Sequence, residues 1–185
     1  VINTSYNGGR IYGDGGTATG TLNGADVIGG SNLDIIAATS IYGAGGNDTI
    51  SFLSSGAVAF FVDAGDGNDA IGNSASIIAF SADTISGGAG ADTISVNGMA
   101  SAGGALLLGG AGHDVITLIN NTNIGSINGG AGADSITVGN TAAATNGSTE
   151  ASAGLLFTIN GGDGADTIRF DHTADGVVFT AITGG

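Results

Sequence analysis

Acidic residues of one type recur along the chain at a nearly constant spacing. Each stands sixth in a glycine-rich phrase, such as GGAGADTI at 87–94, GGAGHDVI at 109–116 or GGDGADTI at 161–168. The recurring residues are Asp48, Asp69, Asp92, Asp114, Asp134 and Asp166, with steps of 21, 23, 22, 20 and 32 residues. A general preference of Asp for glycine-rich turns does not explain one register kept through six loops. Short carboxylates at fixed backbone positions are instead typical of ligands for a hard cation.

The composition favours the same interpretation. Fifteen of the sixteen acidic residues are Asp, although Glu would solvate a surface equally well. The only basic residues are Arg10 and Arg169, so the formal net charge is −14, which disfavours binding to nucleic acid or to anionic lipid. Apolar residues make up 42% of the chain, enough to build a core, while 38 glycines and the absence of Pro, Cys and Trp indicate repetition.

Apolar residues flank each loop in register with the aspartates. Two residues before each loop stand Ile11, Ile41, Val62, Ile85, Leu107, Ile127 and Ile159; two after each Asp stand Ile28, Ile50, Ile71, Ile94, Ile116, Ile136 and Ile168. Four after the Asp, the alternation continues at Phe52, Val96, Leu118, Val138 and Phe170. Period-two patterns rich in β-branched residues predict short strands with one buried face. We therefore predict an all-β fold, a parallel β-solenoid of about seven rungs of about 22 residues, with the loops stacked on one edge.

A degenerate first unit extends the repeat toward the start of the chain. IYGDGG at 11–16 matches IYGAGG at 41–46, and GADVI at 24–28 contributes Asp26 as a seventh aspartate. Insertions are expected near 17–23 and 139–153, and residues 1–185 are expected to form a single domain. Because the chain begins at Val1 and shows no signal peptide, we expect a segment of a larger secreted protein.

The loops resemble the RTX, or hemolysin-type, nonapeptide repeat G-G-x-G-x-D-x-U-x. The resemblance implies bound Ca²⁺, with carboxylates supplied by the six aspartates and Asp26. Backbone carbonyls would complete the sites, and those expected are Gly43, Gly45, Gly87, Ala89, Gly109, Ala111, Gly129, Ala131, Gly161 and Asp163. RTX rolls repeat the motif every nine residues, whereas this chain has it once per turn. One column of at most six ions is therefore expected, and these ions are expected to be needed for folding.

Other polar residues receive less specific interpretations. The side chains of Asp63, Asp66 and Asp163 are expected to be solvated turn residues, and His113 and His172 to be structural or at the surface. Surface charge is the expectation for Asp14, Asp34, Asp83, Asp171, Asp175 and Glu150. Neither an HExxH pair nor a G-x-S-x-G elbow occurs, so an enzyme is not expected.

The leading functional hypothesis is a calcium-dependent structural protein that self-assembles at the cell surface, similar in character to RTX proteins of S-layers and extracellular matrices. Self-association into a filament or lattice, with cell-surface polysaccharide as a further partner, would follow. The alternatives are a calcium-triggered folding and secretion module of a toxin, protease or lipase, and the spacer of an adhesin. All these hypotheses place the protein outside the cell, and no apolar stretch is long enough for membrane insertion.

Overall fold

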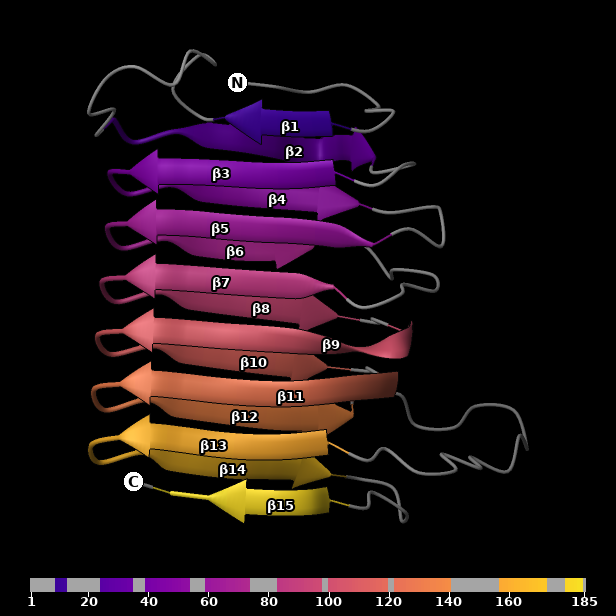
Figure 1. Ribbon diagram of the computed structural model, residues 1–185, viewed down its shortest axis with the longest axis vertical. Helices are drawn as coiled ribbons and strands as arrows, with labels where there is room; N and C mark the ends of the chain where they lie inside the picture. The colour runs from indigo at the N-terminus through magenta and orange to yellow at the C-terminus, as the bar shows by residue number, and fades with distance from the viewer. Residues whose placement is uncertain are drawn as a thin grey trace.

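In the part of the chain that the structure describes, fifteen β-strands make up two parallel sheets that lie face to face (Figure 1). The computed structural model describes residues 9–12, 24–34, 39–53, 59–73, 83–97, 100–119, 122–140, 157–172 and 179–184. The eight-stranded sheet contains β1 (Gly9–Tyr12), β3 (Thr39–Gly45), β5 (Phe60–Asp66), β7 (Thr84–Ala89), β9 (Ala100–Ala111), β11 (Thr122–Ala131), β13 (Phe157–Asp163) and β15 (Phe179–Thr183). The seven-stranded sheet contains β2 (Val27–Asp34), β4 (Thr49–Leu53), β6 (Ala70–Asn73), β8 (Thr93–Asn97), β10 (Val115–Ile119), β12 (Ser135–Asn140) and β14 (Thr167–His172).

Each turn of the solenoid consists of an odd-numbered strand, a glycine loop and an even-numbered strand. All the loops that join β3 to β4 through β13 to β14 lie on one edge, at the left of Figure 1. Equivalent residues of successive turns pair directly, as Ile50 does with Ile71 and Ile71 with Ile94. The predicted parallel β-solenoid is therefore confirmed. The predicted number of seven rungs is slightly too low, because β15 adds a further strand to the eight-stranded sheet.

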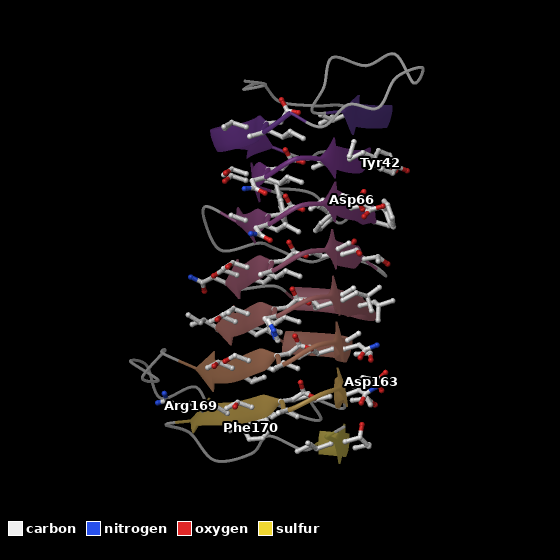
Figure 2. All side chains as sticks on the ribbon, turned by 90° about the vertical axis from the view of Figure 1, so that its left-hand side faces the viewer. Tyr42, Asp66, Asp163, Arg169 and Phe170 are labelled. Carbon is white, nitrogen blue, oxygen red and sulfur yellow. The ribbon has the colours of Figure 1, made fainter. Side chains whose placement is uncertain are left out.

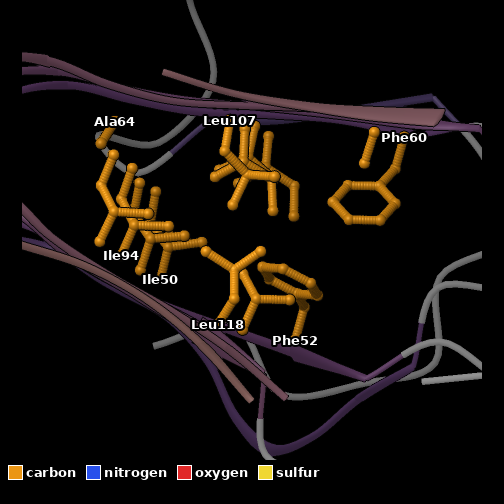
Figure 3. Packing of buried hydrophobic residues seen from close by; sticks show 14 of the residues in the cluster. Ile50, Phe52, Phe60, Ala64, Ile94, Leu107 and Leu118 are labelled. Carbon is orange, nitrogen blue, oxygen red and sulfur yellow. The ribbon is translucent and has the colours of Figure 1, made fainter. Parts of the chain in front are cut away.

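The core consists of stacked aliphatic side chains from both sheets (Figure 3). The predicted residues on both sides of the loops are buried from Ile11 to Ile159, and Ile168 packs partly buried against them. At the end of the core away from the loops, the rings of Phe52 and Phe60 lie 4.9 Å apart between centroids. One rung cannot bury such a face alone, so stacking of identical positions is what stabilises the fold.

Three details differ from the sequence expectations or lie beyond them. Phe170 was expected to point inward but is 38% exposed, because β14 is the last strand of its sheet and no described rung covers it. The insertion predicted at 139–153 starts later, since β12 continues through Asn140. Residues 17–23 and 141–153 lie outside the described residues. Across the described part of the chain, no helix is long and apolar enough to cross a membrane.

Candidate metal centre

Glycines shape the loop edge because successive loops stack closely. In the loop 87–92, Gly88 and Gly90 have φ values of 111° and 136°, a region that glycine adopts without steric cost. A Cβ on Gly90 would overlap the carbonyl oxygen of Gly67 in the preceding loop. The glycine pattern is thus a requirement of stacking one loop on the next.

One oxygen of each recurring aspartate joins neighbouring turns. The backbone N–H of Asp92 donates to Asp114 Oδ1 at 2.9 Å, and the N–H of Asp114 donates to Asp134 Oδ1 at 2.8 Å. The same bond recurs from Asp26 to Asp48, Asp48 to Asp69, Asp69 to Asp92 and Asp134 to Asp166, at 2.7 to 2.9 Å. Asp26 therefore joins the same column, as the degenerate first unit predicted.

The second oxygen of these aspartates is buried and has no hydrogen-bond partner. This holds for Oδ2 of Asp26, Asp48, Asp69, Asp92, Asp114, Asp134 and Asp166. A buried carboxylate oxygen without a donor costs several kcal/mol unless a cation or a proton compensates it. A column of such oxygens along one edge therefore calls for positive charge.

Backbone carbonyl oxygens of the next loop lie near the Oδ2 atoms of the loop aspartates. A Cβ placed on Gly87 would lie 2.5 Å from Asp92 Oδ2 and 2.6 Å from the carbonyl oxygen of Gly109 in the next loop. Equivalent convergence occurs at Gly43, Gly109 and Gly129, where the next-loop carbonyls belong to Ala64, Gly129 and Gly161. The carbonyls of Gly109, Gly129 and Gly161 thus lie where the sequence placed ligands. Ala64 was not among the predicted ligands, because this loop departs from the glycine that the repeat has at its first position.

Carbonyls at the third loop position have a different environment. Ala89, Ala111, Ala131 and Asp163 each accept a hydrogen bond of 2.6 to 2.7 Å from the fourth-position N–H of the preceding loop. One lone pair of each oxygen is therefore committed to the loop ladder, and only the second could reach an ion. Ligation of an ion stays a prediction for all the carbonyls named in the sequence analysis, including those of Gly43, Gly45 and Gly87.

Burial and neighbouring carboxylates disfavour the ionised form of aspartates in the column. Burial raises the pKa of Asp92 to about 6, although the hydrogen bond from the Asp69 N–H lowers it, and the carboxylates of Asp114 and Asp69 raise it further. Burial likewise raises the pKa of Asp69 and of Asp114. A bound cation would reverse these effects, since a nearby opposite charge favours the ionised form.

Calcium fits this set of donors. Among the described residues no three His, Cys, Asp or Glu side chains form a metal cluster, so an ion here would depend on carbonyls together with the loop carboxylates. Ca²⁺ accepts six to eight such oxygens in flexible geometry, whereas zinc and other transition metals favour nitrogen and sulfur. The aspartates would hold the ion through Oδ2, and the first-position carbonyls would complete its shell.

The fold and the loop edge together define a parallel β-solenoid with a column of candidate cation sites. The RTX calcium-binding nonapeptide repeat matches the chain in four copies, at residues 40–53, 80–98, 125–141 and 158–171, about a third of its length. The chain therefore carries repeats of the RTX calcium-binding family, as the loop motif predicted. Neither the curated proteins nor the solved structures contain a match to it.

Asp83 was expected at the surface and is instead 1% exposed. It immediately precedes β7, at the edge opposite the loops, where its Oδ1 accepts the N–H of Phe60 at 2.8 Å and its Oδ2 has no partner. No local pattern predicted this burial, because Asp83 lies in a return segment without a recurring motif. Asp14, Asp175 and Glu150 lie outside the described residues.

The remaining loop side chains lie near the surface. Asp66 and Asp163 are exposed on the side of the eight-stranded sheet in Figure 2, which looks onto the loop edge. Asp63 is half-buried, and this burial raises the pKa of its carboxyl group. His113 is exposed, and its Nδ1 accepts the N–H of Ala133 at 2.8 Å, a structural role between neighbouring loops.

Proposed function

We propose that this chain is a calcium-dependent structural unit of an extracellular protein that self-assembles into a surface layer, filament or matrix, without catalysis. The observation that carries the proposal is the exposed apolar surface on the last described strand of each sheet. These strands are β14 and β15, in which Phe170 and Ile182 are 38% and 46% exposed. Proteins with RTX repeats are typically secreted, and extracellular calcium would fill the loop column.

An exposed apolar side chain that continues a core column favours the stacking of a further rung on it. Ile182 belongs to β15 and continues the inner column of Ile159, with which it pairs. A rung from another copy would cover this residue as Ile159 is covered within the chain. Polysaccharide at the cell surface stays a further candidate partner.

Sedimentation and electron microscopy with and without Ca²⁺ test the proposal. Calcium is expected to produce assemblies, and an excess of chelator is expected to disperse them. Substituting Ile182→Lys should weaken end-to-end assembly. Val115→Lys is the matched control, because Val115 is 43% exposed but lies in β10, in the middle of its sheet. If Val115→Lys abolished assembly and Ile182→Lys did not, the copies would associate side by side rather than end to end. If the protein stayed monomeric at high concentration with calcium, the proposal would be contradicted.

The second candidate is a calcium-triggered folding module of an exported toxin, protease or lipase, or an adhesin spacer. It is favoured by the buried Oδ2 atoms without a hydrogen-bond partner in Asp69, Asp92, Asp114, Asp134 and Asp166, because an ion-free column would oppose folding. Calcium-induced β-structure in a protein that stays monomeric would support this candidate over assembly. Unchanged far-UV circular dichroism in excess chelator would contradict calcium-coupled folding in both.

A further inference from the structure

The first position of the loop decides whether there is space beside the aspartate. In the described loops this residue is glycine at 43, 87, 109, 129 and 161, and alanine only at 64. At Gly87 a Cβ would lie 2.5 Å from Asp92 Oδ2 and 2.6 Å from the Gly109 carbonyl oxygen. Both separations are shorter than a carbon–oxygen contact allows, so a side chain here must displace one or both of the oxygens that an ion would use.

Ala64 places a methyl group at this position. Gly65 pairs with Ala44 on one side and with Gly88 on the other, so Ala64 shares a column with Gly43 and Gly87. Its side chain is 0% exposed and belongs to the hydrophobic core, into which it points at the loop end in Figure 3. The carboxylate of the same loop is Asp69, whose Oδ2 is buried without a partner.

We infer that the row of calcium sites is interrupted at Ala64. The methyl group offers no lone pair and stands at the loop position where, beside the glycines of other loops, Asp Oδ2 and the next-loop carbonyl converge, so no ion binds between loops 64–69 and 87–92. The preceding site is kept, because the carbonyl of Ala64 still faces Asp48 Oδ2. Ions therefore bind in two groups, one on each side of this step. The inference rests on the calcium role proposed above.

Counting bound ions by native mass spectrometry and calorimetry tests the inference on the full chain. Ala64→Gly removes only the methyl group and is expected to bind one more Ca²⁺ per chain than the wild type. Ala44→Gly is the matched control, because Ala44 lies in the neighbouring loop but is exposed, at the second position with φ of 83°. Its count should equal that of the wild type, even if relief of the positive φ raises stability.

A gained ion cannot result from misfolding, so Ala64→Gly decides the question. If Ala64→Gly and the wild type bind the same number of calcium ions per chain, and both bind calcium, the row of sites is not interrupted at Ala64. The proposed calcium binding would then still stand. The converse change, Gly109→Ala, should remove one ion if circular dichroism shows that the variant folds. Absence of any bound calcium in the wild type would refute the calcium role itself, and the interruption with it.

Discussion

Replacing Asp83 with asparagine should stabilise the folded protein at neutral pH. The carboxyl group is 1% exposed, its Oδ1 accepts one hydrogen bond from Phe60 N–H, and its Oδ2 accepts none. Burial raises its pKa from 3.8 to about 6, although the hydrogen bond from Phe60 lowers it. A difference of this size corresponds to about 3 kcal/mol of unfolding free energy when the group is ionised in both states.

The sign of the pH dependence follows from the raised pKa. Between pH 4 and 6 the folded state binds more protons at Asp83 than the unfolded state, so its contribution to stability falls as the pH rises through this range. Asparagine has the same shape without the charge, and can still accept the Phe60 N–H. Its buried amide lacks a further partner, so the expected gain at pH 7.5 is about 1–3 kcal/mol.

Urea unfolding at saturating calcium, at pH 7.5 and at pH 4.5, measures this effect. The advantage of Asp83→Asn over the wild type should be large at pH 7.5 and should shrink at pH 4.5. Both proteins keep the calcium loops, so titration of the loops cancels in the comparison. Asp66→Asn, at an exposed loop position, is the control and should change stability by less than about 0.5 kcal/mol. The reasoning is refuted if Asp83→Asn gives no gain at pH 7.5, or an equal gain at both pH values.

Two further substitutions test the loop stacking and the core. Gly90→Ala should destabilise the calcium-loaded protein by more than about 2 kcal/mol, because its Cβ overlaps the Gly67 carbonyl and its φ is 136°. Ala91→Gly, at the exposed next position, is the control, and similar melting temperatures for both variants would contradict the stacking argument. Ile94→Ala should cost about 2–5 kcal/mol, since Ile94 is completely buried in the middle of its ladder. The same change at the half-buried Ile168 should cost less, and equal losses in urea unfolding would contradict the packing described here.

Much of the architecture could be predicted because each turn repeats one short pattern. The Ile columns and the register of Ile50, Ile71 and Ile94 follow from spacing alone, since a parallel ladder places equivalent residues side by side. Phe170 does not follow this pattern, because it is exposed although it occupies a repeat position that is buried in other turns. Its exposure depends on the neighbour that follows β14, and a local pattern carries no information about that neighbour.

The amino-acid sequence by itself determined that this protein is a parallel solenoid with one aspartate per loop, because stacking requires glycine at the tight turns and alternating apolar residues in the strands. Only the tertiary structure decided how the two oxygens of each aspartate differ, since Oδ1 accepts the N–H of the preceding turn and Oδ2 is buried without a hydrogen-bond donor. It also buried Asp83 and turned the methyl group of Ala64 toward the core. These outcomes depend on contacts between turns about 20 residues apart, which no single repeat contains.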